Sequence, residues 1–262
     1  MSTEVMTEAP FGSQDKTWRG LLEVSIAKSR KTRGSNYVQL ATTATVSTVS
    51  SKEELPQPRC RTVVFRGFLS NVESDNDDLY NVCGTTQNNS DDTDSNLLLP
   101  CIMKMCTDGR SKKVEELAKN PISEVVWWFP KTSEQYRIRG NIILVGGGDN
   151  NTESNNITDI ARKELWGNLS DPARDSFLDD STIIPGEVFV ESNKEQTTTK
   201  TTTGGGRDPE TGKVIQPPPS NFLLMLLSPT NVDYLRLTGA QYRQVDTLDS
   251  TTKQWSSKRV NP

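Results

Sequence analysis

The 262-residue sequence contains no histidine. This absence excludes Ser-His-Asp and Cys-His catalysis, zinc bound through imidazole, and haem held by a histidine ligand. Proton transfer in this protein must therefore use a carboxylate, lysine, tyrosine, cysteine, water or a cofactor.

Cysteine is scarce, and its spacing does not favour a shared metal ion or a redox pair. The four cysteines are Cys60, Cys83, Cys101 and Cys106, and no two of them form a Cys-x-x-Cys pair. Cys101 and Cys106 lie five positions apart on one expected strand, so their side chains point to opposite faces. We interpret the cysteines as reduced thiols of a cytosolic protein and predict no metal site.

Long apolar runs are also missing. No run approaches the ~20 residues that cross a bilayer. Residues 1–15 show neither a secretory signal nor a transit peptide. A net charge of −4 gives little support to nucleic acid or an anionic membrane as the main partner. We therefore expect a cytoplasmic protein with no nucleic-acid and no membrane partner, and we leave entry into the nucleus open.

Polar residues are concentrated in three tracts, which are residues 75–96, 146–156 and 193–219. The first is dense in Asp, Asn, Ser and Thr, and the third carries a Thr run, three glycines and three prolines. Such tracts bury too little apolar area to fold alone, so we predict disordered insertions. Residues 1–15 are expected to form a flexible N-terminus and residues 16–262 a single domain.

Strand-like patterns dominate the rest of the chain. Strands are predicted at residues 37–49, 59–69, 97–106, 124–129, 134–145, 222–227, 231–237, 242–245 and 254–260, with a turn at Ser228-Pro229-Thr230. Helices are predicted at residues 18–31, 111–119, 157–166 and 172–178. We predict a mainly β protein with a closed or partly closed antiparallel barrel, because closure removes exposed strand edges.

The segment Thr107-Asp108-Gly109-Arg110-Ser111-Lys112-Lys113 runs from a strand end through a glycine into a helix start. The first turn of a helix presents unpaired N–H groups and a partial positive charge, which suit a phosphate. Ser111 adds a hydroxyl, and the neighbouring cations add charge. The alternative is a solvated basic helix surface that follows a glycine turn.

A second cationic segment is Arg61-Thr62-Val63-Val64-Phe65-Arg66. On a strand, Arg61, Val63 and Phe65 share one face, and Thr62, Val64 and Arg66 share the other. A charge inside so apolar a run needs a partner, which is either a bound anion or a carboxylate of the protein. Together the two segments could hold one phosphate and leave a flat apolar slot beside it, as a phosphorylated planar cofactor requires.

Two further features allow either a site or a structural role. Gln135 offers both a donor and an acceptor to the edge of a heterocycle, or it serves as a structural amide on a strand. Trp127-Trp128-Phe129 is interpreted as core and dimer contact, with stacking on a ligand as the alternative.

The order and spacing of these motifs resemble the pyridoxamine 5′-phosphate oxidase-like family, and more narrowly the branch whose FMN-binding domain is typified by the cyanobacterial protein Alr4036. The motifs that carry the resemblance are Gln39–Thr42, Pro58–Phe68, Thr107–Lys112, Asn120–Pro121, Trp127–Phe129, Glu134–Arg137, Leu169–Arg174, Pro185–Gly186 and Trp255–Pro262. The resemblance implies an FMN-binding split β-barrel and a homodimer, with one FMN in each of two clefts at the interface.

The resemblance also assigns residues to the cofactor. Those implied to wrap the flavin and its phosphate are Arg61, Thr62, Val63, Val64 and Arg66. Cys106 and Thr107 would line the ring edge, and the phosphate would be bound by Ser111, Lys112 and Lys113. Gln135 and Arg243 would contact the flavin from other strands. No catalytic residue is assigned.

The sequence also departs from the oxidases of this family. Their late Arg-x-His pair is replaced by Tyr242-Arg243, Leu235 stands where they have a tryptophan, and Arg174 is the one candidate for a substrate phosphate. We therefore predict an FMN-binding flavoprotein, an oxidoreductase of unassigned small-molecule substrate. The alternatives are a non-catalytic FMN- or tetrapyrrole-binding protein, and a scaffold that uses its polar insertions to bind partners.

Overall fold

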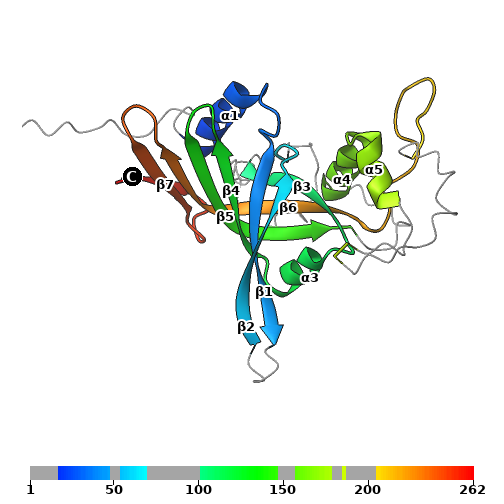
Figure 1. Cartoon of the computed structure of the whole chain (residues 1–262), viewed down its shortest axis with the longest axis horizontal. Coiled ribbons are helices and arrows are strands. Elements are labelled where there is room, and N and C mark those ends of the chain that lie inside the picture. Colours follow the sequence, from blue (N-terminus) through cyan, green and yellow to red (C-terminus); the bar gives the residue numbers. More distant parts are fainter. Residues whose placement is uncertain (1–16, 48–53, 70–100, 147–156, 179–184, 187–204) are drawn as a thin grey trace, which may run out of the picture.

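The computed structural model describes residues 17–47, 54–69, 101–146, 157–178, 185–186 and 205–262 (Figure 1). Its helices are α1 (Trp18–Ser29), α3 (Lys112–Lys119), α4 (Ile157–Gly167) and α5 (Asp171–Leu178). Its strands are β1 (Tyr37–Ser47), β2 (Glu54–Val64), β3 (Met103–Asp108), β4 (Ile122–Phe129), β5 (Glu134–Val145), β6 (Phe222–Arg236), β7 (Tyr242–Leu248) and β8 (Trp255–Val260). Among these helices, none has the length and apolar character that a membrane span requires.

All strand pairs are antiparallel, in the order β2-β1-β4-β5-β6-β7-β8, and β3 pairs with the first half of β6. The chain just after β2 then closes the ring against β3. Phe68 and Met103 form an isolated bridge, and the Arg66 amide donates to the Lys104 carbonyl at 2.8 Å. The predicted mainly β, partly closed antiparallel barrel is therefore confirmed, with β7 and β8 continuing the sheet beyond the ring.

The predicted turn at Ser228-Pro229-Thr230 is wrong, because β6 runs through it without a break. β6 accommodates the proline with a β-bulge, because Arg139 pairs with Asn231 and Gly140 with Pro229, which leaves Thr230 as the extra residue. A Cβ atom at Gly140 would lie 2.0 Å from the Ser228 carbonyl oxygen, so only glycine fits there. The sequence pattern suggested two strands because proline usually interrupts a strand.

Two hydrophobic clusters lie on opposite faces of β6. Met225 and Leu227 pack inside the barrel, whereas Leu224 and Leu226 pack under α4 with Trp166. Both faces of this part of β6 are thus covered, which explains why every residue from Phe222 to Leu227 is buried. Figure 1 shows α4 and α5 together on this side of the sheet.

α1 covers one end of the barrel. Thr17 caps the helix by accepting from the Gly20 amide at 3.2 Å, and Trp18 and Leu22 enter the core. The buried carboxylate of Glu134 accepts from the Ser25 hydroxyl of α1 at 2.7 Å and from the Tyr234 hydroxyl at 2.8 Å. These bonds tie α1 to β5 and β6.

The β1–β2 hairpin projects from the barrel, downward in Figure 1. β1 pairs with β2 along the whole of both strands, but with β4 only over Gln39–Ala41. Pro56 and Pro58 lie within β2, which therefore begins earlier than predicted. Proline is tolerated there because β2 is the terminal strand of the sheet path. α3 packs beside β1 at the base of this hairpin.

The predicted insertion 75–96 and all but the first residue of 146–156 lie outside the described residues. Of the third insertion, residues 205–219 are described. They form a loop in which Arg207 and Val214 make an isolated bridge. The division into one domain with three insertions stays a prediction.

Candidate functional site

Lys113, in the first turn of α3, donates to two hydroxyl groups. Its Nζ lies 2.8 Å from Thr107 Oγ1 and 3.0 Å from Ser111 Oγ, and the two hydroxyl oxygens are 3.2 Å apart. Thr107 and Ser111 are buried. Ser111 is the residue before the helix, yet its hydroxyl makes no capping bond to the helix backbone. This arrangement concentrates hydrogen-bond donors at a helix N-terminus, which is the chemistry of a phosphate site.

Arg61 lies next to this cluster and belongs to a closed ring of hydrogen bonds. Its Nη2 donates to Glu116 Oε2 at 2.6 Å, and its Nη1 donates to Thr42 Oγ1. The Thr42 hydroxyl in turn donates to Glu116 Oε2 at 2.6 Å. The carboxylate partner that the sequence left open for Arg61 is therefore Glu116 of α3.

Sequence reasoning missed both Thr42 and Glu116. Glu116 follows Lys112 by four positions and Lys113 by three, so one helix face carries all three side chains. That spacing was the available signal. Thr42 ends the Gln39–Thr42 motif, but no local pattern marks it as a partner of Arg61, because that contact depends on the pairing of β1 with β2.

Arg61 and Lys113 are close enough to repel each other. Burial, followed by the charge of Arg61, lowers the pKa of Lys113 below its ordinary value, while Asp108 and Glu116 act in the opposite direction. A second anion between the two cations would relieve this repulsion.

Arg66 and Cys106 lie beside the same cluster. Nε of Arg66 is buried and has no hydrogen-bond partner among the described residues. Burial raises the pKa of the Cys106 thiol, and the nearby charges of Arg66 and Lys113 partly offset this effect. A buried donor without a partner indicates an anion or a polar ligand at this position.

The β2 residues of the predicted site divide between two faces. Val63 is buried in the core, whereas Thr62 is exposed and Val64 is half-buried. Because β2 is the terminal strand of the sheet path, one edge of its backbone has no strand partner among the described elements over Glu54–Val64. This open edge could present backbone groups to a flat ligand.

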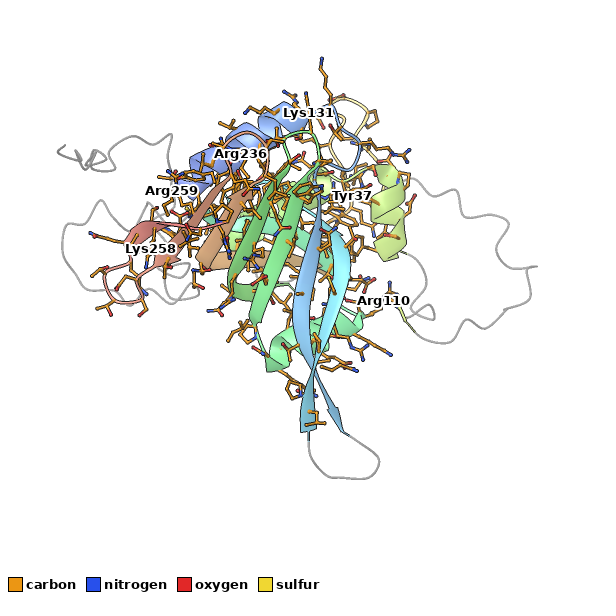
Figure 2. All side chains as sticks on the ribbon, turned by 60° about the vertical axis from the view of Figure 1, so that its left-hand side comes forward. Tyr37, Arg110, Lys131, Arg236, Lys258 and Arg259 are labelled. Atoms are coloured by element: carbon orange, nitrogen blue, oxygen red, sulfur yellow. The ribbon has the colours of Figure 1, made fainter. Side chains whose placement is uncertain are left out.

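The two remaining cations of the glycine segment are placed differently from Lys113. Arg110 turns back onto Asp108, with its Nε and Nη2 3.0 and 2.6 Å from the carboxylate oxygens. Burial alone would raise the pKa of Asp108, but these bonds hold this pKa below its ordinary value. Figure 2 shows Arg110 near α3, away from Arg236 and Arg259. Lys112 is exposed beside Gly186, where an added Cβ would lie 3.8 Å from its Cε.

Gln135 and Arg243 lie on the other face of the sheet from Arg61. Arg61 is paired with the buried Leu40, whereas Gln135, Leu235 and Arg243 form one cross-strand row next to the exposed Trp128. Cross-strand neighbours share a face, so one chain does not bring Gln135 and Arg243 to the phosphate cluster. Farther along β5 and β6 the same face is covered by α4, which packs on Ile143, Leu224 and Leu226.

Arg174 is not available to a substrate. Its side chain is fully buried and donates to the carbonyls of Trp166, Gly167 and Leu169, and so caps the end of α4. The expectation that it could bind a substrate phosphate is therefore wrong. Trp127 is likewise structural, because it is buried and donates its Nε1 to the Ser35 carbonyl at 2.8 Å.

Comparison with known proteins identifies the source of this arrangement. The sequence model of the pyridoxamine 5′-phosphate oxidase FMN-binding domain matches residues 15–146. The chain belongs to this family. It is 30% identical over 254 residues to pyridoxine/pyridoxamine 5′-phosphate oxidase 2 of Arabidopsis thaliana, which covers 96% of this chain and 100% of the relative.

Solved structures agree with this family assignment. An FMN-binding protein from Nostoc punctiforme, described as pyridoxamine 5′-phosphate oxidase-related, is 27% identical and covers 98% of this chain and 100% of its own, with a TM-score of 0.62. PhzG from Burkholderia lata is 16% identical over 92% of this chain and 91% of its own, with a TM-score of 0.56, and shows the fold alone. The fold of this chain is the split β-barrel of the pyridoxamine 5′-phosphate oxidase-like family.

FMN is the cofactor of this family, and the residues of the cluster fit it. The buried hydroxyls of Thr107 and Ser111, the Lys113 ammonium and the Arg61 guanidinium suit a phosphate monoester. Within the described part of the chain Nε of Arg66 has no acceptor, which leaves one further donor for the cofactor.

Proposed function

We propose that this chain is an FMN-dependent oxidoreductase of the pyridoxamine 5′-phosphate oxidase-like family. The observation that carries the proposal is the convergence of Lys113, Thr107, Ser111 and Arg61 at the N-terminus of α3. The name of the Arabidopsis relative, an oxidase of pyridoxine and pyridoxamine 5′-phosphates, supports the class of reaction.

In this proposal the chain binds and orients the cofactor. Lys113, Ser111 and Arg61 would hold the phosphate, with Lys112 at its outer side. The open edge of β2 at Val63 and Val64 would border the ring on the side of Cys106. FMN supplies the redox chemistry when bound, so no side-chain nucleophile is required and the lack of histidine is compatible with activity.

The proposal includes a homodimer. Gln135 and Arg243, which the family resemblance assigns to the flavin, lie on the outer face of the sheet, away from Arg61 of the same chain. In a dimer that uses this face, Gln135 and Arg243 of one chain would lie at the cofactor bound by the other chain. Trp128 is 42% exposed on the same face, which favours its burial at an interface. A cytoplasmic location, as the sequence predicts, belongs to this proposal.

The visible spectrum of the purified protein, followed by a titration with FMN, tests the binding. We expect flavin absorbance or saturable uptake of FMN, and a protein that neither contains nor takes up FMN would contradict the proposal. Loaded protein is then assayed for aerobic oxidation of pyridoxamine 5′-phosphate and pyridoxine 5′-phosphate, and for oxidation of a reduced nicotinamide cofactor. Turnover of any of these three substrates supports the proposed oxidoreductase activity.

A non-catalytic FMN- or tetrapyrrole-binding protein is the second candidate. Two observations favour it, which are the lack of any histidine and the ion pair of Arg243 with Asp233. A flavin-loaded protein that turns over none of these substrates would support this candidate.

A further inference from the structure

The ring formed by Arg61, Thr42 and Glu116 places an acid inside the phosphate cluster. Glu116 Oε2 accepts from Arg61 Nη2 and from the Thr42 hydroxyl, both at 2.6 Å, and the Glu116 side chain is only 11% exposed. An anion therefore shares the guanidinium to which the cofactor phosphate would bind.

The positive charges of Arg61 and Lys113 are balanced in different ways. Arg61 is neutralised by Glu116, whereas Lys113 donates to the neutral hydroxyls of Thr107 and Ser111. Glu116 also acts on Lys113, whose pKa it raises against the larger effects of burial and Arg61. The carboxylate is thus close to both cations that would hold a phosphate.

We propose that Glu116 is a built-in counter-ion of the phosphate site, which stabilises the site while it is empty and weakens its hold on the cofactor phosphate. This inference rests on the proposed binding of FMN. It implies that FMN is held reversibly and exchanges with free cofactor, because the site retains its own anion when the phosphate leaves.

The physical reason is competition between two anions for the same cations. Without Glu116, Arg61 and Lys113 would repel each other in the empty site, so the carboxylate stabilises that state. Once a phosphate is bound, the carboxylate repels it across a short, partly desolvated distance. Glutamine at this position keeps an oxygen that can accept from Thr42 and Arg61 but carries no charge.

The test compares Glu116→Gln with Glu115→Gln in the full chain. Glu115 is the preceding residue of the same helix and is exposed, so it controls for the loss of one charge near the site. We expect Glu116→Gln to lower the Kd for FMN by about tenfold, the size of effect that one adjacent charge has on a protonation equilibrium. We expect it also to slow FMN dissociation and to lower the Tm of the FMN-free protein. Glu115→Gln should leave the Kd for FMN and the FMN dissociation rate within about twofold of the wild-type values, and the Tm of the FMN-free protein unchanged.

Inorganic phosphate, used as a competitor of FMN, should show the same gain in affinity for Glu116→Gln. An affinity for FMN that is equal to or weaker than that of the wild type would overturn the inference, as would an equal gain in Glu115→Gln. If the wild type binds no FMN, the proposed function itself has failed. If the wild type binds FMN and Glu116→Gln does not tighten it, only the counter-ion role has failed.

A second pair of variants keeps the inference testable if Glu116→Gln alone does not fold. Arg61→Gln leaves Glu116 charged, and the double variant Arg61→Gln/Glu116→Gln removes both charges together. We expect the double variant to bind FMN several-fold more tightly than Arg61→Gln, because only the repulsion by Glu116 differs between them. Equal or weaker binding by the double variant would overturn the counter-ion role.

Discussion

Asp233 of β6 holds Arg243 of β7 through both carboxylate oxygens, with Nε of Arg243 3.0 Å from one and Nη2 2.9 Å from the other. Arg137 of β5 bonds the same carboxylate from the other side. The three residues cross three strands on the outer face of the sheet. The guanidinium that the family resemblance assigns to the flavin is therefore fixed by a neighbour on its own chain.

The first prediction concerns the titration of Asp233. Burial alone would raise the pKa of Asp233, but Arg243 and Arg137 hold this pKa below its ordinary value. Arg243→Gln should raise this pKa, measured by NMR titration of the carboxyl carbon. The loss of stability relative to the wild type should be present above about pH 4, the ordinary range of an aspartate, and should shrink as the pH falls through the folded-state pKa. A loss that grows on acidification would contradict the ion pair.

Asp246 of β7 should show the opposite pH dependence. It is almost completely buried, accepts from Gln244 Nε2 at 3.0 and 2.9 Å, and burial raises its pKa above the ordinary value. The stability contributed by the protonated form is complete below the ordinary pKa of about 4 and is lost as the pH rises through the folded-state pKa. Urea denaturation at several pH values should show this fall in the wild type. The fall should disappear in Asp246→Asn, and an unchanged slope would show that another group causes it.

The third prediction ranks the cations of the phosphate site. Lys113→Met should weaken FMN binding by about 1.5–3 kcal/mol, the range for hydrogen bonds to charged groups. Lys112→Met should cost less than about 1 kcal/mol because Lys112 is exposed to solvent. Titration followed by quenching of flavin fluorescence measures both. Equal losses in the two variants would mean that the phosphate lies outside the hydroxyl cluster.

Gly140→Ala should be among the most damaging single substitutions in the barrel. The added Cβ would lie 2.0 Å from the Ser228 carbonyl oxygen, and backbone on both strands would have to move. We expect a loss of about 3 kcal/mol or more in the free energy of unfolding. Gly167→Ala is the matched control, since nothing lies within 4 Å of its added Cβ. A Gly140→Ala protein as stable as this control would contradict the bulge geometry.

The fifth prediction addresses the proposed homodimer. Trp128→Asp places a charge at an apolar position of the outer face and should convert the dimer to a monomer, measured by analytical ultracentrifugation. Ile215→Asp is the control, because Ile215 is 65% exposed on the loop beside α4, where Trp166 donates to the Gln216 carbonyl, and not in the row of Trp128, Gln135 and Arg243. If the wild type is already a monomer, or if both variants remain dimers, the outer face is not the interface.

Local patterns predicted much of the fold. The alternation along β2 correctly placed Arg61 and Val63 on one face, because side chains alternate with a period of two. The α3 segment was also predicted correctly, since its strand end, glycine and basic first turn all lie within a few residues. Alternation cannot show what lies across from a face, however. The partner of Arg61 is supplied by another element, and neither Glu116 nor Thr42 was predicted.

The errors have a similar origin. Arg174 looked like a free cation, but the end of α4 folds three carbonyls around it. Pro229 looked like a turn, but β6 continues through it with a bulge at Thr230, opposite Arg139 and Gly140 of the neighbouring strand. In both cases the deciding feature is backbone geometry, which side-chain patterns do not reveal: the end of α4 lies five to eight residues before Arg174, and the pairing of β6 with β5 surrounds Pro229.

The first half of β6 has a consequence for how the protein opens. One face of Phe222–Leu227 lines the barrel interior, and the other face packs under α4. Loss of the packing on one face would therefore destabilise the packing on the other. The barrel and the helical layer should therefore behave as one cooperative unit rather than as independently opening parts. A substitution that disrupts the packing under α4 should then also loosen β3, which pairs with this half of β6 and leads into the segment that contains Lys113. Such a substitution should weaken cofactor binding although it lies far from the cofactor.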